Sequence, residues 1–243
     1  MSAAHVIQGG ADILILCDHA SNAVPPDVDL GIDPRLLGKH VAIDIGAAAV
    51  SEALAAQLGA PAILATVSRL VIDLNREPDS AGLIPHISDG HAIPGNGGVD
   101  RAERIARFHA PYHRRIADTI RARRPALLVS VHSFTPRLEQ HDGPSRPWEI
   151  GVLYNRNARA ARIGIELLER AGVVTGDNEP YSGRLLNATM NRHAEGNGIP
   201  YLGIEIRNDL ISDAAGVAHW AQLLASIVKD VRNSLARTGS PAT

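Results

Sequence analysis

Short apolar runs alternate along this sequence with longer amphipathic stretches, and this alternation limits the possible fold more than any other feature. The helical patterns cover about 34–58, 100–124, 157–171 and 213–237. The apolar runs predict buried strands at 12–17, 61–67, 126–131, 149–154 and 201–206, with a further candidate at 67–75. Strands that alternate with helices are typical of parallel sheets. We therefore predict one domain, residues 1–243, with a three-layer α/β/α fold around a central mixed, mostly parallel sheet.

The composition excludes several classes of partner and site. The formal charge of −2 gives no reason to expect nucleic acid or an anionic membrane as a partner. No apolar run reaches the roughly 18 residues of a membrane span, and the first residues lack a signal-peptide pattern. We therefore expect a cytoplasmic protein. The single cysteine, Cys17, excludes a multi-cysteine metal site, so the 11 histidines are the best candidates for transition-metal ligands.

Reactive side chains recur near the predicted strand ends, where open α/β sheets bind their ligands. They are Asp18 and His19 on the first strand, Arg69, Asp73, Asn75 and Arg76 after the second, His132 on the third and Glu205 on the last. Two histidines and one carboxylate can hold a catalytic zinc ion, with the fourth position left to water. A lone histidine at a strand end is more often structural, so the prediction depends on the repetition over four strands.

Two of the acidic residues allow two interpretations each. Asp44 lies among small apolar residues of the predicted helix 34–58. It is either a metal ligand or part of a polar helix edge with His40, four residues before it. Glu205 interrupts an apolar strand, where it is either a general base or the partner of an arginine in a buried ion pair.

Two further features are given no chemical role. The helical pattern around "FHAPYH" places Phe108 and Tyr112 on one stripe and His109 and His113 on the next, which favours a packing face with solvated histidines. Cys17 has no evident histidine–acid relay, so we interpret it as a small buried hydrophobic residue. The sequence also lacks the Gly-x-Ser-x-Gly elbow of serine hydrolases.

Eight motifs follow one another from residue 17 to residue 209. They are "CDHASNAVP", "HVAIDIGAA", "SRLVIDLNR", "FHAPYH", "SVHSFTP", "GVLYNR", "GDNEPYSG" and "IEIRND". Together they resemble the N-formylglutamate amidohydrolase family. More distantly, Asn75-Arg76, His132 and Glu205 are similar to residues of zinc carboxypeptidases and aspartoacylase-like deacylases. The resemblance implies a zinc-exopeptidase-like or phosphorylase/hydrolase-like fold and a zinc-dependent amidohydrolase.

The resemblance also implies a metal site. His19 and His132 would bind one zinc ion, and Glu205 would act as the general base. The related zinc enzymes carry His-x-x-Glu where this sequence has His19-Ala-Ser-Asn22, so the expected carboxylate is missing. We favour Asp44 as the third ligand over Asn22, because a neutral amide is a poor zinc ligand.

The substrate contacts follow from the same resemblance. Arg69, Asn75 and Arg76 would bind the α-carboxylate of the substrate. Arg184 is our candidate for a side-chain carboxylate, and Tyr181 would help to close the site. The expected reaction is hydrolysis of N-formyl-L-glutamate to formate and glutamate, so the expected partner is a small N-acyl amino acid. The alternatives are a deacylase for another N-acyl amino acid or small peptide-like amide, and a catalytically silent binding protein on the same scaffold. The sequence does not predict the oligomeric state.

Overall fold

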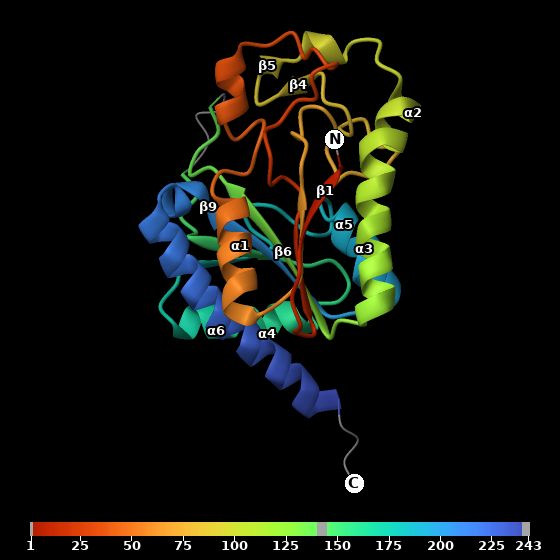
Figure 1. Ribbon diagram of the computed structural model, residues 1–243. Helices are drawn as coiled ribbons and strands as arrows, with labels where there is room; N and C mark the ends of the chain where they lie inside the picture. Colours follow the sequence, from red (N-terminus) through yellow and green to blue (C-terminus); the bar gives the residue numbers. More distant parts are fainter. Residues whose placement is uncertain (1, 140–144, 240–243) are drawn as a thin grey trace.

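A seven-stranded sheet forms the centre of the molecule (Figure 1). The computed structural model describes residues 2–139 and 145–239. Its strands are β1 (Ala4–Ile7), β2 (Ile13–Cys17), β3 (Ala62–Ala65), β6 (Leu127–Phe134), β7 (Ile150–Leu153), β8 (Thr175–Asp177) and β9 (Tyr201–Arg207), in the spatial order β1-β3-β2-β6-β9-β7-β8. β1 is antiparallel to β3 and β7 to β9, whereas the other neighbouring pairs are parallel. The predicted mixed, mostly parallel sheet is confirmed.

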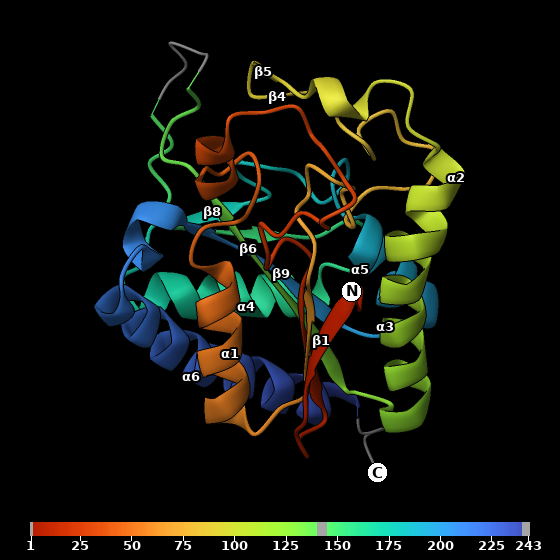
Figure 2. The ribbon, with the colours of Figure 1, turned by 45° about the horizontal axis from the view of Figure 1, so that its top comes forward.

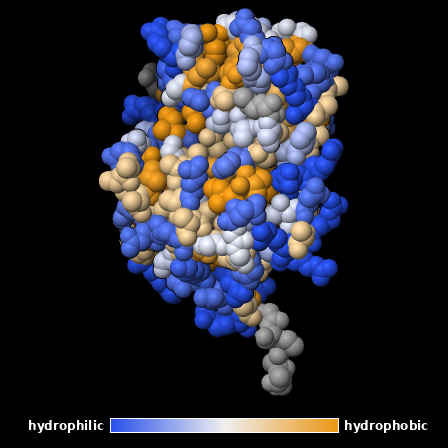
Figure 3. Space-filling view, viewed as in Figure 1, coloured by the Kyte–Doolittle hydropathy of each residue, from blue (hydrophilic) through white to orange (hydrophobic). Residues whose placement is uncertain are grey.

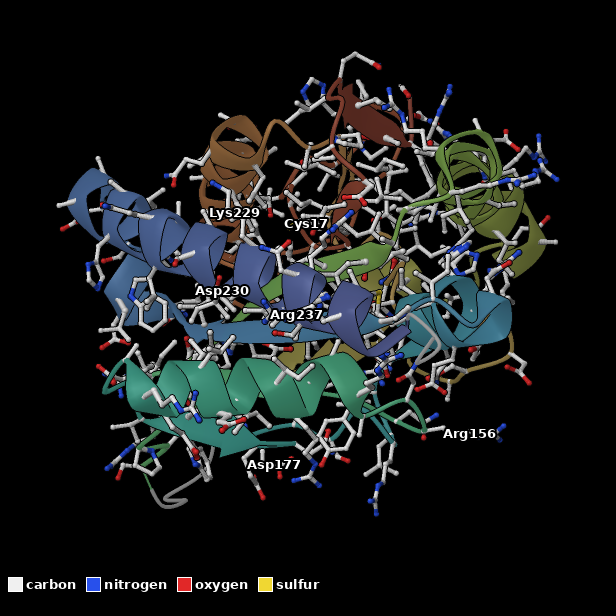
Figure 4. The ribbon with its side chains drawn as sticks, turned by 90° about the horizontal axis from the view of Figure 1, so that it is seen from below. Cys17, Arg156, Asp177, Lys229, Asp230 and Arg237 are labelled. Carbon is white, nitrogen blue, oxygen red and sulfur yellow. The ribbon has the colours of Figure 1, made fainter. Side chains whose placement is uncertain are left out.

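Helices cover both faces of this sheet, as the α/β/α prediction requires. They are α1 (Ala47–Leu58), α2 (Arg101–Arg104), α3 (Ala110–Arg123), α4 (Arg159–Arg170), α5 (Ala188–His193) and α6 (Ala214–Gly239). α1, α4 and α6 pack on one face, and α3 and α5 lie on the other (Figures 2 and 4). A π-helical turn, η3 (Ile105–His109), joins α2 to α3, so that 101–123 forms one continuous helix.

Short elements complete the connections between strands and helices. They are η1 (Pro34–Gly38), β4 (Ile87–Ser88), β5 (His91–Ala92), η2 (Pro94–Asn96), η4 (Glu195–Asn197) and η5 (Asn208–Ile211). β4 and β5 form a two-stranded hairpin within residues 76–99, a stretch rich in glycine and proline. The hairpin and its neighbouring loops lie at the top of the molecule in Figure 1.

Two predicted elements are wrong in part. Only the second half of the predicted helix 34–58 is α-helical; 39–46 forms turns, because Gly46 adopts a φ of 80° immediately before α1. Asp44 therefore lies in a turn and not inside a helix. The candidate strand 67–75 also consists of turns, in which the Val71 amide donates to the Ser68 carbonyl. Its apolar side chains are buried without any strand pairing among the described residues.

The central strands are buried along their length. Every residue of β2 is buried, and β6 and β9 each have one residue of intermediate exposure, as continuous apolar runs predict for strands covered on both faces. On the face shown in Figure 3, hydrophobic side chains form separate groups between hydrophilic ones. In the described ranges, no helix is both long and apolar enough to cross a membrane.

Candidate active site

Three neighbouring strands and one turn bring the reactive side chains together. β2 leads directly into Asp18 and His19, while β6 and β9 carry His132 and Glu205. His132 and Glu205 are register partners across the parallel β6–β9 pair, which places them side by side. The turn before α1 supplies Asp44, whose amide donates a 3.1 Å hydrogen bond to the carbonyl of His19. This bond holds the turn against the end of β2.

These side chains surround a pocket of about 150 Å³, which can hold a small ligand. Eight of the nine site residues that the sequence predicts line it. The eight are His19, Asp44, Arg69, Asn75, Arg76, His132, Tyr181 and Glu205.

Both histidine rings contact the same carboxylate oxygen. Oδ2 of Asp44 lies 2.8 Å from Nδ1 of His132 and 3.2 Å from Nδ1 of His19. All three side chains are buried, and one donor atom from each lies within 4.8 Å of the other two. The three residues could therefore hold a single metal ion.

Each histidine has a second carboxylate on its other ring nitrogen. Nε2 of His19 lies 2.7 Å from Oδ1 of Asp73, and Nε2 of His132 lies 3.4 Å from Oδ2 of Asp18. A neutral imidazole carries only one N–H, so its second nitrogen would point a lone pair at a carboxylate oxygen. Each ring is therefore either an imidazolium or a neutral ring whose Nδ1 shares a cation with Asp44. A carboxylate on the outer nitrogen is the usual support of a metal-binding histidine.

The electrostatics of the cluster keep its acids ionised. Burial raises the pKa of Asp44, but His19 and His132 outweigh this effect and hold that pKa well below its usual range. Burial lowers the pKa of His132, yet its contacts with Asp18 and Asp44 raise it well above the usual value. The protein without a metal therefore favours positively charged rings between ionised carboxylates.

Carboxyl groups outnumber guanidinium groups around the two histidines. The carboxyl groups belong to Asp18, Asp44, Asp73 and Glu205, and the guanidinium groups to Arg69 and Arg76. Arg69 donates to Asp44 at 3.0 Å and to Asp73 at 2.8 Å. Buried carboxylates without enough positive charge are costly, so a divalent cation would balance this donor set. The residues present fit such an ion.

Glu205 lies next to this cluster with an unused oxygen. Its side chain is buried, and its Oε2 has no hydrogen-bond partner among the described residues. Burial raises the pKa of Glu205 to about 7, against the opposing effect of His132. A carboxyl group with a pKa near neutrality and an unpaired oxygen is suited to proton transfer.

Asn75 and Arg76 also line the pocket, and hydrogen bonds hold the turn to which they belong. The Asn75 amide donates to Oδ1 of Asp73, and Oδ1 of Asn75 accepts from the amide of Thr189, both at 3.0 Å. The side-chain Nδ2 of Asn75 makes no hydrogen bond within the described ranges. Its donor capacity, like most of that of the Arg76 guanidinium, remains available to a ligand.

A family model for N-formylglutamate amidohydrolases matches residues 11–212. The chain belongs to this family. A solved structure of gene product Atu2144 from Agrobacterium tumefaciens is similar over 97% of both chains, with 32% sequence identity and a TM-score of 0.92. The N-formylglutamate amidohydrolase from Ralstonia eutropha JMP134 shares the fold over 98% of this chain and 100% of that one, with 18% identity and a TM-score of 0.71. No protein among the curated ones matches the chain.

Two candidate site residues from the sequence, one for the metal and one for the substrate, lie away from the pocket of this N-formylglutamate amidohydrolase family member. Asn22 is exposed, and its Nδ2 donates to the Leu37 carbonyl at 2.8 Å. The structure therefore brings Asp44, and not Asn22, to the histidines. Arg184 is also exposed and does not line the pocket, because its turn packs Gly183 against the backbone of Tyr154.

Three residues at the site were given no role from the sequence. Asp18 directly precedes His19 and Asp73 lies two residues before Asn75; both stand among the reactive side chains near predicted strand ends, which was the available signal. Arg146 donates to the Tyr181 hydroxyl at 3.1 Å, and its guanidinium lies 5.0 Å from the centre of the Tyr181 ring. No recognisable sequence pattern marks Arg146, so only the fold could reveal it.

The expectation of solvated histidines in "FHAPYH" is wrong. His109 and His113 are each only 2% exposed. Their Nε2 atoms bond to the carbonyls of Arg76 and Leu74, at 3.0 and 2.9 Å. The burial of Cys17 is confirmed (Figure 4), and that burial raises the pKa of its thiol well above the usual value.

Proposed function

We propose that this family member is a zinc-dependent hydrolase of N-acyl amino acids and that its substrate is N-formyl-L-glutamate. One observation carries the proposal: two histidine Nδ1 atoms converge on Oδ2 of Asp44 beside the unpaired Oε2 of Glu205. Such a set combines three metal ligands with a general base.

His19, His132 and Asp44 would hold the metal through their converging atoms. A zinc ion there would lower the pKa of a water molecule and polarise the scissile carbonyl. Asp73 and Asp18 would keep the outer nitrogens of the two rings protonated and so fix which nitrogen binds. For Arg69 we replace the expected contact with the substrate α-carboxylate: it would hold Asp44 and Asp73 in place, since it donates to both carboxylates.

Glu205 would take the proton of the attacking water and deliver it to the nitrogen of the leaving amino acid. Its pKa near 7 lets it accept a proton in one half of the reaction and donate it in the other. Its position across β6–β9 from His132 keeps it beside the metal ligands.

Asn75 and Arg76 would bind the α-carboxylate, because both line the pocket and can donate hydrogen bonds to an anion. For the side-chain carboxylate we replace Arg184 by Tyr181 together with Arg146. The Tyr181 hydroxyl accepts from Arg146 and can donate its own proton to a substrate oxygen. The adjacent guanidinium would strengthen that donor.

A second candidate is a deacylase for an N-acyl amino acid with an apolar part. Phe134 and Leu186 line the pocket, and Leu185, the chain neighbour of Leu186, is 83% exposed. These side chains offer an apolar surface to a longer acyl group or an aliphatic side chain.

The experiment that tests both candidates measures bound zinc and the hydrolysis of a small panel of substrates by the purified protein. The panel is N-formyl-L-glutamate, N-acetyl-L-glutamate, N-formyl-L-glutamine and N-formyl-L-leucine. We expect about one zinc per chain and the highest kcat/KM for N-formyl-L-glutamate. A preference for N-formyl-L-leucine would favour the second candidate, and zinc binding without any hydrolysis would indicate a silent binding protein.

A further inference from the structure

One face of the continuous helix 101–123 carries three buried polar side chains. His109, Tyr112 and His113 are at most 2% exposed, and the π-helical turn η3 ends at His109. The spacing of three and four residues places them on one side of the helix. Apolar residues would cover a sheet at lower cost, because a buried polar group needs a partner. The partners of these three side chains lie next to the proposed metal ligands, which we call the metal half of the site, and next to the proposed α-carboxylate ligands, which we call the substrate half.

Tyr112 contacts the metal half of the site through Asp18. Its hydroxyl donates to Oδ1 of Asp18 at 2.7 Å, and the other oxygen of Asp18 lies 3.4 Å from Nε2 of His132. Asp18 has no hydrogen-bond partner for that second oxygen among the described residues. Tyr112 therefore sets the orientation of the carboxylate that faces the outer nitrogen of His132.

His109 and His113 contact the substrate half of the site through backbone carbonyls. His113 donates from Nε2 to the Leu74 carbonyl and His109 donates from Nε2 to the Arg76 carbonyl. These carbonyls flank Asn75 and fix the backbone on both sides of it.

The protonation state of His113 follows from its neighbours. Burial lowers the pKa of His113 to about 3, so the ring is neutral near pH 7. Its single proton lies on Nε2, where it meets the Leu74 carbonyl, and its Nδ1 accepts from Nε2 of His193 at 2.9 Å. The hydrogen bond from His193 thus stabilises the tautomer of His113 that carries its proton on Nε2.

We propose that this helix face positions the two halves of the site through separate contacts. Tyr112 acts through Asp18 on His132, and His109 and His113 act through backbone carbonyls on Asn75 and Arg76. All three are positioning residues. The inference depends on the proposed function for the ligands that each half binds.

The test compares Tyr112→Phe with His113→Leu in the full-length protein. Tyr112→Phe should weaken zinc binding, measured by competition with a chelator, by about tenfold to a hundredfold. It should leave amide hydrogen exchange in 73–76 unchanged. His113→Leu should leave zinc affinity unchanged, accelerate exchange in 73–76 and raise KM for N-formyl-L-glutamate about tenfold, with kcat within about twofold.

Matched variants separate positioning from general loosening. His113→Gln keeps an N–H donor and should restore most of the exchange protection and of the KM. Tyr201→Phe removes a buried hydroxyl that bonds to Asn187 and Glu195 away from the metal ligands, and should not alter zinc affinity. The proposal is overturned if Tyr112→Phe and His113→Leu change zinc affinity and exchange in parallel, or if neither changes its own readout. If the wild type does not cleave N-formyl-L-glutamate, the proposed function fails, while zinc affinity and exchange still decide the positioning.

Discussion

Nδ1 of His132 lies 2.8 Å from Oδ2 of Asp44, although 88 residues separate them in the chain. His132 belongs to a central strand and Asp44 to a turn that a hydrogen bond ties to the neighbouring strand end. Oδ2 of Asp44 is also 3.2 Å from Nδ1 of His19. The proposed metal site therefore depends on this one oxygen more than on any other atom.

Replacement of Asp44 should release the metal. Asp44→Asn keeps the size of the side chain but removes its charge, so we expect zinc affinity to fall by at least about a hundredfold. Asn22→Ala is the matched control, because Asn22 is exposed and bonds to Leu37. Equilibrium competition with a chelator measures both. Full zinc occupancy in Asp44→Asn with loss in Asn22→Ala would reverse the choice of third ligand.

Replacement of Glu205 should separate binding from chemistry. Glu205→Gln keeps the shape but cannot accept a proton, so kcat for N-formyl-L-glutamate should fall by about 10²–10⁴-fold. Zinc content should stay the same, because Glu205 is not among the three converging ligands. Steady-state kinetics on metal-loaded protein measures the effect. Wild-type kcat in Glu205→Gln would remove Glu205 from the mechanism.

The turn that carries Asp44 depends on Gly46. Gly46 has a φ of 80°, and a Cβ there would lie 2.3 Å from the carbonyl oxygen of Ile211. Gly46→Ala should lower the free energy of unfolding by about 2–4 kcal/mol and weaken zinc binding, because the turn must move. Gly59→Ala is the control: Gly59 has a φ of 59° with open space around its Cβ position, and should cost about 1 kcal/mol without affecting zinc. Urea unfolding compares the two, and equal losses would contradict the role of the clash.

The buried histidines should make the fold sensitive to acid. Burial lowers the pKa of His113 to about 3 and of His193 to about 4, below the value near 6.5 of an unfolded chain. Below about pH 6.5, these two histidines therefore bind protons in the unfolded state but stay neutral in the folded state. Stability should fall as pH drops from about 6.5 to about 4, by up to about 1.4 kcal/mol per pH unit for each histidine.

Urea unfolding at several pH values checks this expectation. Neighbouring charges modify the effect: Arg192 and His109 lower the pKa of His113 further, whereas Asp18 opposes them. The wild type should lose more stability between pH 7 and pH 5 than His113→Gln does. His219→Gln, at an exposed position, is the control and should follow the wild type. Parallel losses in wild type and His113→Gln would show that this ring is protonated in the folded protein.

Arg146 should affect the choice of substrate. Arg146→Gln removes the charge beside Tyr181, so KM for N-formyl-L-glutamate should rise about tenfold. KM for N-formyl-L-leucine should change little, because that substrate has no side-chain carboxylate. Arg184→Gln is the matched control and should leave both values unchanged. An equal rise for both substrates would exclude a role for Arg146 in recognising the side chain.

Local pattern predicts the central part of the fold and fails at its edges. The runs that became β2, β3, β6, β7 and β9 are continuous and apolar because these strands are buried on both faces. β1 is largely half-exposed, and β8 has only the three residues Thr175–Asp177, so neither carries such a run. The apolar stretch 67–75 resembles a strand because burial, and not extended conformation, selects its side chains.

The sequence by itself determined the class of sheet and placed His19, His132 and Glu205 at or just after the ends of buried strands, because a continuous apolar run is a local pattern. Only the tertiary structure decided for Asp44 over Asn22, moved Arg184 out of the pocket and buried His109. The physical reason is that the surroundings of a polar side chain depend on segments far away in the chain. Their packing decides whether that side chain meets water, a carboxylate or a backbone carbonyl.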